Sequence, residues 1–170
     1  MDTKDYIKME LGGLKRGFER ALKELSQQEL VWRPASGCNS MGLILLHVAR
    51  SEDSFIQTRV LGKPQVWEAE KWYEKMNLSL QDTGSHLTVD QVNCFPVPEF
   101  KDVMAYYDAV RGQTLAYLKG MPAEELDKKI SMPPFGDLTI AAIFSIIINH
   151  SAQHIGEISY LRGLLRGMDK

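Results

Sequence analysis

The sequence predicts an all-α protein, a four-helix bundle with a long crossover between its second and third helices. Three observations lead to this fold class. Apolar residues recur three and four positions apart in four long segments, which is the spacing of one face of a helix. No segment shows the convincing alternation of apolar and polar residues that is typical of β-strands. Two connections between the segments are short and one is long, an arrangement found among four-helix bundles.

The size and charge of the chain restrict the class of protein. Its 170 residues suffice for one domain with a sizeable core, and we expect a single domain over residues 1–170. The chain is 44% hydrophobic and 25% charged, with a net charge of −2 at pH 7. These values are ordinary for a globular protein and give no reason to expect nucleic acid or a membrane as a partner. The charged N-terminal segment lacks the apolar region of a secretory signal, so we expect a cytoplasmic protein.

The first helix is predicted from a stripe of apolar residues at helical spacing. Its members are Ile7, Leu11, Leu14, Phe18, Leu22 and Leu25. Ser26 and Glu29 follow with the spacing of a capping box, so a short extra turn is expected there. Pro34 has no backbone N–H and cannot continue a helix, so this part of the bundle ends before it.

The second helix is expected to begin after Asn39 or Ser40, because either side chain can accept the free N–H groups of a first helical turn. It runs through MGLILLHVARSEDSFIQTRVLG and ends at Gly62. Residues 63–96 form the long crossover, which shows no sustained period. Connections of this length are unusual inside a compact domain and are often functional, and we expect one or two short helices within this one.

The third helix is predicted to start near Pro98, a residue favoured in a first turn, and to end at Gly120. The fourth helix is the most apolar, and Asp137 or Thr139 is expected to cap it. Its inward stripe holds six aliphatic residues and two histidines. These are Ile140, Ile143, Ile147, His150, His154, Ile158, Leu161 and Leu165.

His150 and His154 stand four residues apart, so both imidazoles project from the same face of one helix and can reach one metal ion. They also lie on the face that points into the bundle, where a histidine loses water and needs partners for its ring nitrogens. A buried histidine that bonds a neighbouring residue would explain either of them alone. The spacing by itself therefore leaves the metal site and the structural role both open.

His47 makes the metal site the favoured interpretation, because it lies on the inward part of a second apolar helix, in LILLHVA. Three neutral imidazole nitrogens suit a borderline divalent ion such as Zn²⁺, Ni²⁺ or Fe²⁺. Three protein ligands also leave a coordination position for water or substrate, which is typical of catalytic sites. The fourth histidine, His86, lies in the polar stretch TGSHLT and is expected to be a solvated loop residue.

Three carboxylates lie near the histidines in the sequence, namely Glu52, Asp53 and Glu157. Glu157 follows His154 by three residues and can share its face, as the acceptor of an imidazole N–H or as a general base, although a solvated role explains it equally well. Glu52 and Asp53 follow His47 by more than a turn and are expected to face solvent. No phosphate-binding glycine motif, GxSxG elbow, CxxC pair or ExxH motif occurs. Cys38 and Cys94 are expected to stay reduced.

Three features of the sequence resemble the DinB/YfiT-like family of four-helix-bundle metalloproteins. The first is Trp32-Arg33-Pro34, which leads into GLILLHVARSED. The second is HSAQHIGEISYLRGLL, which is similar to the family helix H-x-x-x-H-x-G-[QE]-[IL]. The third is the four-helix layout with its long crossover. Together these features cover nearly the whole chain.

The resemblance implies a divalent-metal site on His47, His150 and His154, which match the family's metal triad one for one. It also implies a homodimer, a small-molecule substrate and, in some members, a low-molecular-weight thiol as cofactor. Activities in the family include thiol-dependent transfer and isomerisation and metal-dependent hydrolysis. Gln153 and Ile155 stand where a second histidine and an arginine are frequent, and this departure leaves the triad intact but weakens the transfer of any one substrate.

Two classes of function follow from these residues. The first is a metal-dependent transferase or hydrolase, in which the ion lowers the pKa of a water or thiol and Glu157 accepts a proton. The second is a non-catalytic, stress-related binding bundle whose histidines, or whose metal, are purely structural. Thermal unfolding with and without a chelator separates them, because a bound metal stabilises the native state alone.

Overall fold

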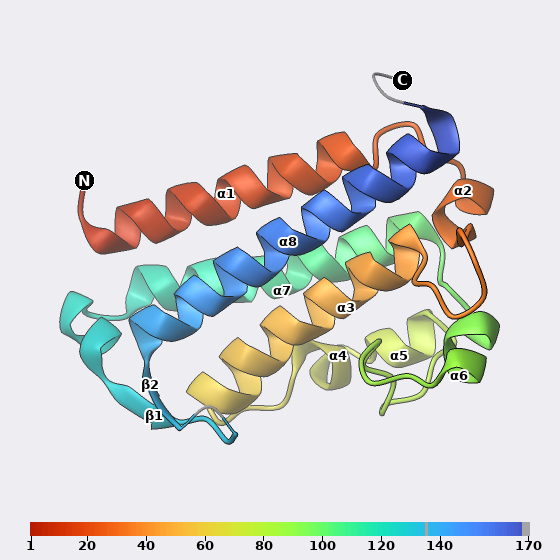
Figure 1. The fold of residues 1–170 in the computed structure, drawn as a ribbon. Helices are drawn as coiled ribbons and strands as arrows, with labels where there is room; N and C mark the ends of the chain where they lie inside the picture. The colour runs from red at the N-terminus through yellow and green to blue at the C-terminus, as the bar shows by residue number, and fades with distance from the viewer. Residues whose placement is uncertain (135, 168–170) are drawn as a thin grey trace.

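Four long helices form the body of the protein, as the computed structural model of residues 1–134 and 136–167 shows (Figure 1). They are α1 (Thr3–Ala21), α3 (Met41–Asp53), α7 (Phe100–Gly120) and α8 (Ile140–Arg166). Helix α8 packs against both α1 and α3, and α3 packs in turn against α7. The predicted all-α four-helix bundle is therefore confirmed. No helix among the described residues is long and apolar enough to cross a membrane.

The first helix is shorter than its apolar stripe predicts. It ends at Ala21, and the N–H of Leu22 closes the last turn on the carbonyls of Phe18 and Arg20. Leu22 is still buried, because the turn that follows folds it back onto the core. The short helix α2 (Gln27–Val31) comes next, and Ser26 and Glu29 form the predicted capping box at its start.

Helix α3 begins at Met41, and of the two predicted caps it is Ser40 that accepts the N–H of Leu43. Its path continues without a break into η1 (Ser54–Val60), a π-helical segment with a wider turn than an α-helix. The helical path therefore ends close to Gly62, as predicted. Together α3 and η1 carry His47 near the middle of the bundle and Arg59 near its end.

The long connection between η1 and α7 holds three short helices rather than one or two. They are α4 (Val66–Ala69), α5 (Trp72–Lys75) and α6 (Val89–Cys94), and Figure 1 shows them along one side of the bundle beside α3. Asp53 fixes the start of this connection to α3, because its carboxylate accepts the N–H groups of Val66 and Trp67 at 2.9 Å. The Tyr106 hydroxyl of α7 donates to the same carboxylate at 2.6 Å.

Glu52 and Asp53 are buried, so the prediction that they face solvent is wrong. Glu52 forms a two-point ion pair with Arg111 of α7, with N···O distances of 2.7 and 2.9 Å. Charged side chains are seldom buried unless they pair with a group of opposite charge. The sequence did not reveal these partners, because Arg111 and Tyr106 lie more than fifty residues further along the chain.

The segment between α7 and α8 contains a short β-hairpin that the sequence did not predict. After the 3-10 helix η2 (Ala123–Asp127), the strands β1 (Lys129–Ser131) and β2 (Asp137–Thr139) pair antiparallel. The sequence shows no convincing strand pattern here, and the hairpin is a small addition to the predicted all-α fold. Each strand has three residues, which is too short for an alternating pattern to stand out. Thr139 ends β2 and caps α8 by accepting the N–H of Ala142.

The core has two parts that meet along the bundle. One lies between α3, α7, the connection and the C-terminal halves of α1 and α8, and it includes the buried aromatic residues Trp67, Tyr106 and Tyr107. The other lies between the first half of α1, the first half of α8 and the β1–β2 hairpin, and it is mainly aliphatic. Between them the two parts hold α3 and α8 in fixed register, and these are the two helices that carry the candidate site.

Candidate metal centre

The three predicted histidines come together from two helices. His47 lies in α3, and His150 and His154 lie one turn apart in α8. The Nε2 atom of His150 is 3.0 Å from Nε2 of His47 and 3.1 Å from Nε2 of His154. One nitrogen from each ring thus belongs to a cluster whose atoms all lie within 4.8 Å of one another. The structure places all three residues where the sequence predicted them to meet.

Two of the three rings are oriented by a hydrogen bond at the opposite nitrogen. Ser85 Oγ lies 2.7 Å from His47 Nδ1, and Glu157 Oε2 lies 2.7 Å from His154 Nδ1. A carboxylate can only accept, so His154 carries its proton on Nδ1 and keeps a free lone pair on Nε2. Glu157 therefore acts on His154, and its predicted role as an acceptor of an imidazole N–H matches the geometry.

The electrostatic surroundings favour neutral imidazoles. The pKa of His47 is lowered to about 4, mainly by burial and in smaller part by the neighbouring His150, His154 and His86. The pKa of His150 is also lowered to about 4, mainly by burial and then by His154, while Glu157 opposes this shift. Both rings are therefore neutral near pH 7, and neutral imidazole is the form that binds metal ions.

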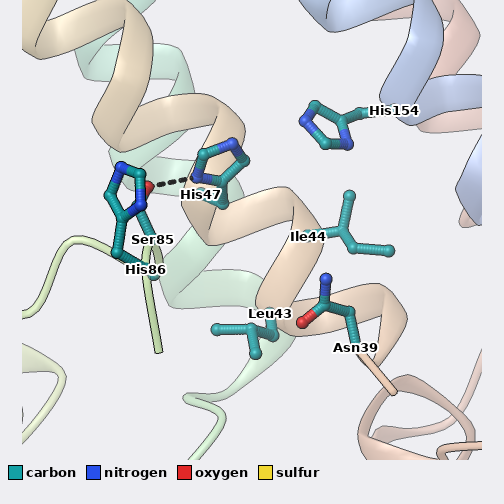
Figure 2. A pocket seen from close by; sticks show the side chains of 8 residues that line it. Asn39, Leu43, Ile44, His47, Ser85, His86 and His154 are labelled. Atoms are coloured by element: carbon teal, nitrogen blue, oxygen red, sulfur yellow. Dashed lines mark hydrogen bonds between the residues drawn. The ribbon is translucent and has the colours of Figure 1, made fainter. Parts of the chain in front are cut away.

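The cluster faces a hollow of about 240 Å³, which makes it accessible from outside the bundle. His47, His154, Leu43, Ile44 and Asn39 form one part of its lining, and Gly84, Ser85 and His86 form the other. Figure 2 shows His47 between the Ser85–His86 segment and His154. The site is therefore built by α3, α8 and one turn of the long connection.

Gly84 allows this turn to approach α3 closely. Its φ is +67°, a left-handed conformation that favours glycine. A Cβ atom at this position would lie 3.3 Å from both Cα and Cβ of His47, tighter than ordinary contact. Glycine thus brings Ser85 to within hydrogen-bond distance of His47.

Sequence reasoning found the histidines and Glu157 but missed the residues of the connection. Ser85 and Gly84 gave no signal, because their function depends on a contact with a helix almost forty residues earlier. His86 is exposed, as expected for a loop residue, but it lines the hollow beside His47 rather than lying apart from the site. The one local hint was the length of the connection, since long connections are often functional.

A helical bundle that gathers three histidines from two helices beside an open hollow defines a class of protein with a potential metal centre. Comparison with protein families identifies the class more closely. The model of the DinB superfamily matches residues 13–158, which is most of the chain. The chain belongs to the DinB superfamily, as the motifs in its sequence indicated.

Solved structures with the same fold agree with this assignment. A conserved protein from Enterococcus faecalis is 24% identical with a TM-score of 0.85, and the match covers 98% of this chain and 99% of that one. YfiT from Bacillus subtilis is 16% identical with a TM-score of 0.64, covering 97% and 90% of the two chains. YfiT is described as a probable metal-dependent hydrolase with an unusual four-helix bundle topology. No curated protein matches the chain.

Proposed function

We propose that this protein is a metal-dependent enzyme, with hydrolysis of a small molecule as its reaction, and that His47, His150 and His154 hold the ion. The observation that carries the proposal is the convergence of three Nε2 atoms beside an accessible hollow that His47 and His154 line. The description of YfiT as a probable metal-dependent hydrolase supports the same class of reaction.

The three histidines fit a divalent ion. Bonds of about 2.0–2.1 Å from one ion to two imidazole nitrogens place those nitrogens roughly 2.9–3.4 Å apart, depending on the angle between the bonds. The observed separations of 3.0 and 3.1 Å fall in this range. Imidazole ligands suit Zn²⁺ or Ni²⁺, with Fe²⁺ or Mn²⁺ as alternatives.

A divalent ion bound there would supply Lewis acidity, lowering the pKa of a water or thiol at its open position. The chain itself does the positioning. Ser85 holds the ring of His47, and Glu157 holds the ring of His154 in the tautomer that presents Nε2. Leu43 and Ile44 line the hollow with apolar surface, which excludes water from part of it and strengthens electrostatic interactions inside.

Metal analysis of protein purified without a histidine tag tests the proposal. We expect about one ion per chain in the wild type, and loss of the ion in His150→Ala, since each of the three ligands is needed for a stable site. His86→Ala is the matched control, because it removes a histidine from the same hollow without removing a proposed ligand. A wild-type metal content near zero, or one that His150→Ala leaves unchanged, would contradict the proposal.

The rival function is a non-catalytic bundle with structural histidines. The same nitrogen separations are compatible with N–H···N hydrogen bonds among the rings, so the rival has its own geometric basis. Titration of a cobalt-substituted protein with azide and with a small thiol separates the two. A spectral change with either ligand shows an exchangeable position on the metal, whereas an unchanged spectrum favours a structural site.

The two titrants also separate hydrolysis from thiol transfer. A site that uses water exchanges azide readily, whereas a site built for a thiol cofactor gives the tighter and more intense response with the thiol, because thiolate is a soft ligand for such ions. A response to thiol alone would therefore move the proposal from a hydrolase to a thiol-dependent transferase.

A further inference from the structure

A second hollow begins where the first one ends. It has a volume of about 510 Å³ and shares Ser85 and His86 with the lining of the histidine hollow. Its remaining walls come from α3, η1, the turn between β1 and β2, and Gln65 and Thr83 of the long connection. Phe55, Met132 and Pro133 give it an apolar surface. The two hollows therefore form neighbouring compartments on the two sides of one turn of the connection.

Two arginines line this second hollow, and they differ in what they contact. Arg50 is 6% exposed and fully engaged: it donates to Gln65 Oε1 at 2.5 Å and to the Asp82 carbonyl at 3.1 Å, and its guanidinium lies 4.5 Å from the Trp67 ring. Arg59 is exposed and has no hydrogen bond or ion pair with any residue in 1–134 or 136–167. Arg59 therefore presents a guanidinium whose donors are free for a ligand.

We infer that the second hollow binds an anionic group of the substrate, with Arg59 as the residue that recognises it. Arginine donors in a fixed fork match the oxygens of a carboxylate or a phosphate. Ser51 and Ser54, which line the same hollow, add hydroxyl donors. This inference rests on the proposed function, because it places the reacting end of the same substrate beside the histidines.

The spacing of the two compartments sets the shape of the substrate. Arg59 follows His47 by twelve residues along one helical path, a separation of roughly 15–18 Å along the axis. A molecule that reaches both must be elongated. The apolar residues Phe55 and Pro133 of the second hollow would contact its chain. The substrate class is thus a small, extended molecule with a metal-binding group at one end and an anion at the other.

Binding of hydroxamates to the metal-loaded protein tests this inference without an activity assay. A hydroxamate ligates a divalent ion, and an alkyl chain can carry either a terminal carboxylate or the neutral carboxamide of the same shape. By calorimetric titration over a series of chain lengths, we expect the carboxylate to bind about three- to tenfold more tightly than the carboxamide, once the chain is long enough to reach Arg59.

The Arg59→Gln variant should lose this preference for the carboxylate while keeping its affinity for the carboxamide. Lys63→Gln is the matched control, because it removes a nearby exposed positive charge that does not line the hollow, and it should keep the preference. Equal binding of both compounds by the wild type, or a preference that survives in Arg59→Gln, would overturn the inference while leaving the proposed function standing. Failure of every hydroxamate to bind the metal-loaded protein would overturn both.

Discussion

At the scale of single residues, the candidate site depends on proton positions. Burial keeps His47 and His150 neutral, and Glu157 fixes the tautomer of His154. Glu157 leaves the lone pair of His154 on Nε2, and the neutral rings of His47 and His150 each keep one nitrogen able to bind a metal ion. The residues that contact the far nitrogens should therefore control metal affinity almost as strongly as the ligands themselves.

Substitution of Glu157 should weaken metal binding. Glu157→Ala removes the acceptor that holds His154, and we expect the metal affinity to fall about 10- to 100-fold. Glu157→Gln keeps an acceptor oxygen without the charge and should fall between the wild type and the alanine variant. Competition with a chromophoric chelator measures all three. Glu124→Ala, an exposed carboxylate on η2, is the control, and an equal loss in both alanine variants would contradict the assigned role.

The neutral histidines also predict how the metal-free protein responds to acid. His47 and His150 have a pKa of about 4 in the folded protein, against an ordinary value of 6.5. Between these two pH values the unfolded chain binds more protons than the folded protein does. The free energy of unfolding therefore increases with pH in this range, and the protein loses stability as the pH falls from 6.5 toward 4. Urea unfolding at several pH values measures this slope. It should be shallower in His47→Gln/His150→Gln, and an unchanged slope would contradict the burial of neutral rings.

At the scale of elements, the long connection supplies the part of the site that the helices cannot. Asp53 fixes its start to α3, and Gly84 lets its later turn touch α3 at His47. Apolar periodicity, a local property of the sequence, predicted the long helices and the inward-facing position of both histidines of α8. The position of Ser85 depends on a long-range contact with no local pattern, so the sequence could not predict it.

Gly84 has two structural effects: it adopts a left-handed backbone conformation, and it lets its turn approach His47 closely. Comparing Gly84→Ala with Gly62→Ala separates these effects. The left-handed backbone alone costs an alanine about 1–2 kcal/mol, and Gly62→Ala pays that same cost, because Gly62 has a φ of +62° and no atom near its Cβ position. We expect Gly84→Ala to lose at least as much stability as Gly62→Ala in thermal unfolding, because its Cβ also meets His47. Metal affinity should fall in Gly84→Ala alone, because its Cβ pushes Ser85 away from His47. Equal affinities in the two variants would show that the close approach is not needed.

At the scale of the whole molecule, a charged pair within the core joins α3, which carries His47, to the neighbouring helix α7. Glu52 of α3 and Arg111 of α7 are both buried and hydrogen-bonded to each other. The sequence predicted Glu52 at the surface, because its neighbours in the chain are polar and its partner Arg111 lies far along the chain. The bundle itself was predictable, since four amphipathic segments have few ways to bury their apolar faces.

Replacing one member of this ion pair should destabilise the protein more than replacing both members with apolar residues. Arg111→Ala leaves the Glu52 carboxylate buried without a partner, and we expect the free energy of unfolding to fall by about 3–5 kcal/mol. Glu52→Leu/Arg111→Leu removes both charges and should recover much of that loss. The exposed pair of Lys15 and Asp108 gives the comparison, since Asp108→Ala should cost about 1 kcal/mol or less. Urea unfolding measures each variant, and a double variant as unstable as Arg111→Ala would contradict this account.

The central claim is that His47, His150 and His154 hold one divalent ion with a position open to the hollow. An anomalous-difference map from crystals of protein purified without a tag tests it most directly. We predict a single strong peak bonded to the three Nε2 atoms, with a solvent or small ligand completing the coordination on the side of Ser85 and His86. No peak at this cluster, or an ion whose coordination is closed by a further protein side chain, would contradict the claim.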